Sequence, residues 1–141
     1  MEETVQRHEL LYRVIKRSQP DSMDEKGRPT SALFKQDNGV SVDRDGDRDE
    51  KIIIKTFKER FDKRFKGLVK VKANVCIDNN IAIIPETSSN IYHAEIFENE
   101  DKVPLGQLKA LILADSSDVV AYEPEVKWVQ NQFMWLCLWK K

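Results

Sequence analysis

The chain has 141 residues, 40% hydrophobic and 33% charged, which is typical of one well-solvated globular domain and excludes an intrinsically disordered chain. Its formal net charge of −1 excludes an overall attraction to nucleic acid or to an anionic membrane. No apolar run approaches the roughly 18 to 20 residues that span a bilayer and the N-terminus lacks a secretion signal, so we expect a cytoplasmic protein without a membrane partner.

The first half of the chain predicts two strands, a loop and a helix. Aromatic and β-branched residues predict strands over 9–16 and 39–43, and the proline-containing segment 17–31 between them is a loop. Residues 32–35 are either a short strand or a turn of helix. A helix over 50–66 follows, because apolar side chains recur every three or four residues at Ile54, Phe57, Phe61 and Phe65. Gly67 is placed to cap its C-terminus.

The second half predicts mainly strands. Strict alternation predicts a half-buried strand over 68–77, a turn at 78–80, and short strands over 81–85, 90–99 and 118–123. Pro104 marks the start of a helix over 104–115, whose apolar face is formed by Leu105, Leu108, Leu111 and Ile112. We therefore predict an α+β fold: a mostly antiparallel sheet of five or six strands with two principal helices packed on it. Residues 1–141 form a single domain, with a flexible N-terminus at 1–8 and a Trp-rich C-terminal segment at 125–141.

The stretch SVDRDGDRDE, residues 41–50, places aspartates at alternate positions around one glycine. Counted from Asp43 as a calcium loop, two further aspartates take the next ligand positions. An arginine, however, stands where the loop requires glycine, and Ile54 stands where it requires glutamate. We therefore predict no metal site but a solvated turn that leads into the helix. The alternative is a polar site in which Asp43 and Arg44 contact a ligand.

Two other polar groups are candidates for function. Eight lysines and arginines lie between Lys55 and Lys72, which indicates either a solvated face or a nucleic-acid surface; we favour the solvated face because the phenylalanines there fall on the buried stripe. His93 shares a strand face with Glu95, an arrangement suited to acid–base chemistry but more often structural. The chain has no glycine-rich phosphate loop and no nucleophile motif, so no cofactor is predicted.

The C-terminal segment holds all three tryptophans and seven consecutive apolar residues, 133–139. One interpretation is a buried last strand or helix. The other is a docking patch for a protein partner or for self-association, because aromatic anchors dominate interfaces. The partner-binding candidates are Trp128, Phe133, Trp135 and Trp139.

Residues 27–44, GRPTSALFKQDNGVSVDR, resemble a signature of small bacterial proteins that have no established activity. The pattern continues with His93 and Ala94 in YHAEI, and Tyr12 and Arg13 near the start fit it as well, so that the resemblance covers roughly residues 9–100. The acidic insertion after Asp43 and the Trp-rich segment depart from it. The resemblance suggests which polar side chains to test for ligand binding: Arg28, Ser31, Lys35, Ser41, Asp43 and His93. The alternative is that these side chains join the loop to the sheet by hydrogen bonds.

These observations lead to three hypotheses about function. The first is a non-enzymatic binding or accessory protein of a bacterial system, which recognises a partner protein and a polar ligand. The second is a nucleotide- or nucleic-acid-directed transferase similar to ADP-ribosyltransferases, with Arg13, Arg28 and Ser31 on the phosphates and Glu95 as the catalytic acid or base. The third, not favoured, is a nucleic-acid binder that uses the basic stripe between Lys55 and Lys72.

Overall fold

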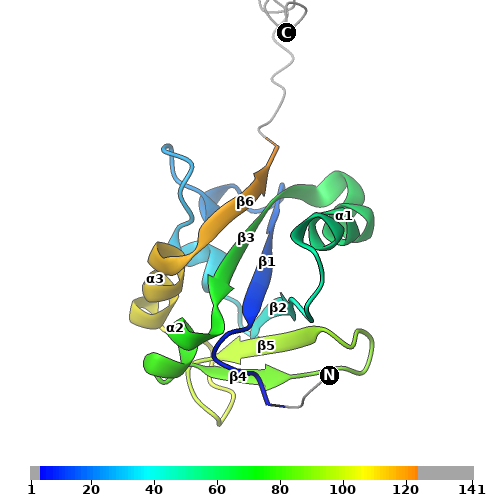
Figure 1. Ribbon diagram of the computed structural model, residues 1–141. Helices are drawn as coiled ribbons and strands as arrows, with labels where there is room; N and C mark the ends of the chain where they lie inside the picture. The colour runs from blue at the N-terminus through cyan, green and yellow to red at the C-terminus, as the bar shows by residue number, and fades with distance from the viewer. Residues whose placement is uncertain (1–3, 124–141) are drawn as a thin grey trace, which may run out of the picture.

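In the computed structural model, which describes residues 4–123, one six-stranded sheet carries helices on both faces (Figure 1). The strand order is β4-β5-β2-β1-β3-β6 and every neighbouring pair is antiparallel. This arrangement confirms the predicted α+β fold. The strands are β1 (Leu10–Lys16), β2 (Val40–Arg44), β3 (Phe65–Lys72), β4 (Ala82–Pro85), β5 (His93–Phe97) and β6 (Asp118–Tyr122). The helices are α1 (Glu50–Phe61), α2 (Ala73–Asp78) and α3 (Gln107–Ser116), with 3₁₀ turns at Pro20–Ser22, Ser31–Phe34 and Asp62–Arg64.

Two apolar clusters lie on the two faces of the sheet. The larger one joins β1, β2, β3 and β5 to α2, α3 and the 3₁₀ turn Ser31–Phe34. The smaller one lies under α1, where Ile53 and Phe57 pack against Tyr12, Val14 and Leu68. Because this smaller cluster contains no residue of β2, β4 or β5, α1 covers only the half of its face that is formed by β1, β3 and β6. None of the helices within residues 4–123 has the length and hydropathy that a membrane span requires.

The predicted helix over 50–66 is correct only as far as Phe61. Asp62 follows with a left-handed φ of 50°, and after one 3₁₀ turn Phe65 already begins β3. Phe65 fits the helical stripe by its spacing but is buried as the first residue of a strand. Gly67 therefore caps no helix: it lies within β3, where a Cβ atom would come 2.6 Å from the carbonyl oxygen of Ala121.

The predicted strand over 68–77 ends early, at Lys72. Its partner β1 begins at Leu10, which pairs with Lys72, so no strand remains for the next residues to pair with. The chain turns instead into α2, where Ala73 and Cys76, three residues apart, are both buried. The alternation in the sequence continues past this point and therefore does not mark the end of the strand.

The other predictions hold with small shifts, except for the buried face of α3. Of residues 32–35, left open between strand and helix, the first three belong to the 3₁₀ turn Ser31–Phe34, and Lys35 follows it in an extended conformation. The helix α3 begins at Gln107 rather than at Pro104, and its buried residues are Ala110, Leu113 and Ala114. The predicted apolar face is wrong for Leu108 and Leu111, which are 72% and 42% exposed. At the N-terminus, where we expected flexibility, Val5 packs in the larger cluster.

Candidate functional site

A polar gap opens where β1 and β2 part, and Arg13 fills it. Only Leu11 and Tyr12 of β1 are in register with β2. Beyond them, Arg13 donates from Nε to the Leu33 carbonyl oxygen at 3.1 Å and from Nη1 to the Ser41 carbonyl oxygen at 3.0 Å. Hydrogen bonds from its guanidinium therefore replace backbone pairing at this point, and they link β1 to β2 and to the 3₁₀ turn Ser31–Phe34.

Arg13 is a buried cation without a carboxylate partner among residues 4–123. It is 2% exposed, and both of its hydrogen bonds go to uncharged carbonyl groups. Burial lowers the pKa of Arg13 to about 10, and no acid in the described part of the chain opposes this shift. Burying a charge is costly unless an opposite charge compensates it. An anion placed beside this guanidinium would supply the missing charge.

A pocket of about 140 Å³ lies beside Arg13, between α1 and the strands β1 and β2. At about 30 Å³ for each water molecule in the liquid, this is room for roughly four or five waters, or for one phosphate or carboxylate group. Three cations and one carboxylate line it, a formal excess of two positive charges, together with one imidazole: Arg13, Lys16, Arg60, Asp43 and His93.

The Asp43 carboxylate of this pocket is already engaged. Its side chain is 3% exposed, and Arg60 Nη2 lies 2.9 Å from Oδ2 while Nη1 lies 3.3 Å from Oδ1. Asn90 Nδ2 donates to both oxygens at 3.3 Å. Asp43 therefore neutralises Arg60 and fixes it to β2. Among the described residues, no carboxylate then compensates the other two cations, Arg13 and Lys16.

Lys16 lies at the end of β1 among other cations. Burial, and then the positive charges of Arg13 and Arg64, lower the pKa of its ammonium group. Its Nζ lies 5.6 Å from the centroid of the Phe61 ring, and no acid in the described range pairs with it. The potential at the pocket is therefore positive.

His93 lies across from Asp43 on the neighbouring strand β5. Its Nδ1 is 2.9 Å from the carbonyl oxygen of Glu86 and 3.4 Å from Oε2 of the same residue. Because a carbonyl oxygen only accepts, the proton sits on Nδ1. The other ring nitrogen, Nε2, is left to accept a hydrogen bond when the ring is neutral and to donate one when it is protonated.

The structure divides the six ligand residues predicted from the sequence into two groups. Ser41, Asp43 and His93 line the Arg13 pocket, although the hydrogen bond between β2 and Arg13 uses the Ser41 backbone. The other three residues contact α3. Arg28 donates to the carbonyl oxygens of Ala114 at 3.2 Å and Ser117 at 3.0 Å, which caps the end of that helix. Ser31 and Lys35 both bind the side chain of Gln107, at the start of α3.

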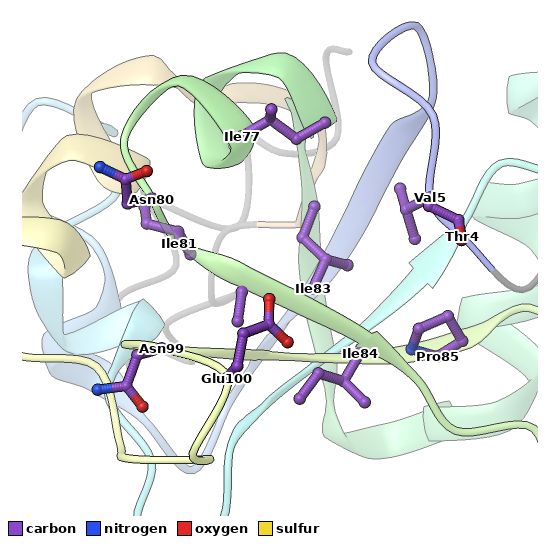
Figure 2. A pocket seen from close by; sticks show the side chains of 11 residues that line it. Thr4, Val5, Ile77, Asn80, Ile81, Ile83, Ile84, Pro85, Asn99 and Glu100 are labelled. Atoms are coloured by element: carbon purple, nitrogen blue, oxygen red, sulfur yellow. The ribbon is translucent and has the colours of Figure 1, made fainter.

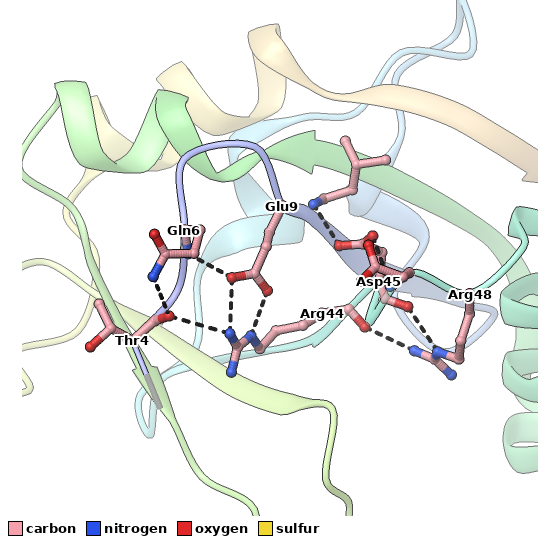
Figure 3. Close-up of polar contacts among 8 residues, drawn as sticks. Thr4, Gln6, Glu9, Arg44, Asp45 and Arg48 are labelled. Atoms are coloured by element: carbon pink, nitrogen blue, oxygen red, sulfur yellow. Dashed lines mark hydrogen bonds and ion pairs between the residues drawn. The ribbon is translucent and has the colours of Figure 1, made fainter. Parts of the chain in front are cut away.

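The acidic stretch forms a tight turn between β2 and α1 (Figure 3). Gly46 and Asp47 adopt left-handed φ values of 57° and 56°, and Asp45 accepts the backbone N–H groups of Leu10 and Asp47. Arg48 donates to the Asp45 carbonyl and stacks on Tyr92, with its guanidinium carbon 3.5 Å from the ring centroid. In residues 4–123 no three acidic, histidine or cysteine side chains gather as a metal site would require.

Arg44, the second residue that this stretch offered to a ligand, is buried in an ion pair. Its Nε lies 2.7 Å from Oε1 of Glu9, and its Nη2 lies 2.9 Å from Oε2 (Figure 3). Burial alone would raise the pKa of Glu9, but hydrogen bonds from Arg44 and from the Gln6 backbone, with the charge of Arg44, lower it overall. Arg44 therefore holds the N-terminal segment to the sheet.

The remaining candidates are dispersed. Within the basic stripe, Lys58, Arg60 and Lys70 are paired with Glu123, Asp43 and Glu50 respectively. Glu95, proposed as a catalytic residue, lies opposite Ser41 in the β2–β5 ladder. The partner-binding candidates Trp128, Phe133, Trp135 and Trp139 lie outside the described residues.

The sequence analysis missed Lys16 and Arg60 as members of the site. Lys16 ends a strand and Arg60 belongs to a helix, so only the tertiary fold brings them beside Asp43. The one available signal was Arg13 itself, a charged residue inside an otherwise apolar strand segment.

No protein-family model, no curated protein and no solved structure matches the chain. Evidence for its function therefore comes from the site itself.

Proposed function

We propose that the chain is a binding protein for a small anionic group, a phosphate or a carboxylate, which it holds in the Arg13 pocket. The observation that carries the proposal is the state of Arg13: it is buried, lacks an acidic partner in the described chain, and lines a pocket with two further cations. An arginine fork is the group that proteins use most readily for planar recognition of carboxylate and phosphate.

The other side chains of the pocket fit this role. Lys16 supplies a positive point charge for the anion. A bound anion would in turn raise the lowered pKa of Lys16 towards its ordinary value, because it offsets the repulsion from Arg13 and Arg64. His93 Nε2 donates a further hydrogen bond when the ring is protonated. We favour binding over catalysis, because Asp43 is held by Arg60 and Asn90, and the Nδ1 side of His93 is held by Glu86.

The size of the pocket limits the ligand. A volume of about 140 Å³ accepts one anionic group and not a whole nucleotide, so the group is either a free ion or one end of a larger molecule. A phosphorylated side chain or a carboxylate of a partner protein fits the accessory role expected from the sequence. The transferase hypothesis placed Arg28 in the same site, and Arg28 is instead bound to the end of α3.

Thermal unfolding in inorganic phosphate, against sodium chloride of equal ionic strength, tests the proposal. A ligand that binds only the folded state adds about 2.7 kcal/mol at a hundredfold excess over its Kd. We expect phosphate to raise the midpoint of the wild type and to lose this effect in Arg13→Met. Arg7→Gln is the matched control, because it removes one cation from an exposed ion pair outside the pocket. Equal shifts in wild type and Arg13→Met would reduce the effect to general salt stabilisation and overturn the proposal.

A further inference from the structure

A groove of about 780 Å³ lies against β4, which is an edge strand of the sheet in residues 4–123 (Figure 2). Apolar side chains from three segments turn towards it: Val5 from the N-terminal segment, Ile77 from α2, and Ile83 from β4. Ile77 is 39% exposed although it lies among other apolar groups. A groove of this size and character is typical of a binding surface.

The backbone of β4 also has unused pairing capacity. Glu86 N donates to the His93 carbonyl oxygen at 3.0 Å, on the side that faces β5. Because hydrogen-bonding direction alternates along an antiparallel strand, Ile84 faces β5 in the same way and Ile83 faces the open edge. The Ile83 N–H and C=O groups therefore lie where an added extended segment would pair, a recurring mode of peptide recognition.

The rim of the groove is acidic. Glu100 lines it and Asp101 follows directly, and neither forms an ion pair within the described part of the chain. Glu98, from the same turn, is held by Lys109 at 3.1 Å. An occupant that combines an apolar segment with a basic end would match both the lining and the rim.

We infer that the groove receives the C-terminal segment of a second copy of this chain. Residues 133–139 are seven consecutive apolar residues, and Lys140 and Lys141 follow them. The apolar run matches the lining of Val5, Ile77 and Ile83, and the two lysines match the uncompensated carboxylates of the rim. No other stretch of the sequence joins an apolar run of this length to a basic end.

The reach of the chain favours a second copy over the same one. The segment leaves from β6, which is five strand spacings from β4, or about 24 Å before any detour around the helices and loops is added. Residues 124–132 would have to bridge this distance, and nine residues span at most about 32 Å when fully extended. A path within one chain therefore leaves only about 8 Å for any detour even when these residues are fully extended. A second copy sets no such limit.

Sedimentation of the full chain over a range of concentrations tests this inference. We expect reversible self-association that Ile77→Asp weakens by about 30-fold or more, the effect of removing a central interface residue. The matched control is Leu108→Asp, an equally apolar and more exposed position on α3. We expect it to associate like the wild type.

Tryptophan emission gives a second readout, because all three tryptophans lie in the C-terminal segment. Emission should shift to shorter wavelength as the wild type associates, and this shift should be absent in Ile77→Asp. Emission that differs between wild type and Ile77→Asp while both sediment as monomers would place the segment in its own groove and overturn the inference of a second copy.

A complementation experiment identifies the two surfaces as partners. Ile77→Asp retains an intact segment, and the double variant Trp135→Ser/Trp139→Ser retains an intact groove. Each variant alone should be monomeric, and an equimolar mixture should form a heterodimer. A mixture that stays monomeric while the wild type associates would overturn the inference, as would a Leu108→Asp variant that dissociates. The phosphate experiment on Arg13 is independent of every one of these outcomes.

Discussion

Two arginines of this domain are buried to the same degree and differ in what compensates their charge. Arg44 is 1% exposed and Arg13 is 2% exposed. Arg44 meets Glu9 through two hydrogen bonds of 2.7 and 2.9 Å. Within residues 4–123, Arg13 meets only carbonyl oxygens, at 3.1 and 3.0 Å. Burial alone therefore does not distinguish a structural arginine from a binding one; the presence of a counter-charge does.

The surroundings of the two arginines explain the difference. Arg44 lies where β2 is still paired to β1, and the incoming N-terminal segment brings Glu9 against it. Arg13 lies just beyond the last paired residues, where the strands separate and a pocket opens. The same separation that leaves Arg13 without an acidic neighbour also provides space for an anion.

The largest effect that this comparison predicts is on the Arg44 pair. Glu9→Gln removes the carboxylate that pairs with the buried guanidinium of Arg44, and breaking a buried pair in this way costs about 3–5 kcal/mol. Urea unfolding at pH 7 measures this loss. As a control, Asp78→Asn removes the carboxylate of an exposed pair with Arg7 and should leave the urea midpoint essentially unchanged. A Glu9→Gln variant as stable as that control would show that Arg44 does not need the Glu9 carboxylate.

The same pair predicts a pH dependence. The pKa of Glu9 is lowered in the folded state. Its contribution to the free energy of unfolding is therefore complete above its pKa in the unfolded chain, about 4.3, and is lost as the pH falls through its lower pKa in the folded protein. The difference in free energy of unfolding between wild type and Glu9→Gln should therefore shrink below about pH 4, because Glu9 is then protonated. A difference that stayed constant down to pH 2 would assign the loss to packing instead.

Arg13→Met should destabilise less than Glu9→Gln does. The variant leaves two carbonyl groups without their donor, a loss of about 1–3 kcal/mol, but it also removes an uncompensated buried charge. We expect the free energy of unfolding, measured in urea without phosphate, to fall by a net amount of about 1–2 kcal/mol. A loss as large as that of Glu9→Gln would mean that the charge of Arg13 is already compensated, and it would remove the main argument for an anion site.

The fold could be predicted from the sequence where a residue pattern reflects a local preference for helix or strand. The prediction was less accurate where a neighbouring strand or helix determines the end of an element. The aromatic and β-branched residues of 9–16 identified β1, but the spacing of Phe65 fits a helix and a strand equally. Val75 and Ile77 continue the alternation of β3 although its partner strand has ended. In α3 two apolar stripes overlap, and the small residues Ala110 and Ala114 form the buried one because they allow close packing.

The site could be predicted only in part, because some of its residues are brought together by tertiary contacts alone. Ser41, Asp43 and His93 could be predicted from a motif of polar residues on predicted strands. Lys16 and Arg60 gain their roles only through tertiary contacts. The sequence shows where arginines occur but not whether a carboxylate faces them, and that difference separates Arg13 from Arg44.

Asp43→Asn tests the sign of the potential in the Arg13 pocket. Asp43 is the one carboxylate that residues 4–123 contribute to the lining. Its neutralisation should therefore strengthen phosphate binding by several-fold, on the order of 1 kcal/mol for a partly screened charge at this range. Calorimetric titration of wild type and variant measures the change. Asp78→Asn, which removes a carboxylate outside the pocket, should leave the phosphate affinity unchanged. Weaker binding in Asp43→Asn would mean that Asp43 acts chiefly by positioning Arg60 for the ligand.

The smallest expected effect is at Lys16, and its sign is the informative part. Because the pKa of Lys16 is lowered in the folded state, the unfolded chain binds the proton more tightly, and stability is reduced below the folded pKa. Lys16→Gln should therefore stabilise the anion-free protein at pH 7, by no more than about 0.5 kcal/mol, as is usual near a surface. Saturating phosphate should reverse the order of the two proteins, since the wild type then gains a ligand contact that the variant lacks. A variant that is less stable than the wild type in both conditions would show that Lys16 stabilises the fold through its contact with Phe61 and does not repel Arg13.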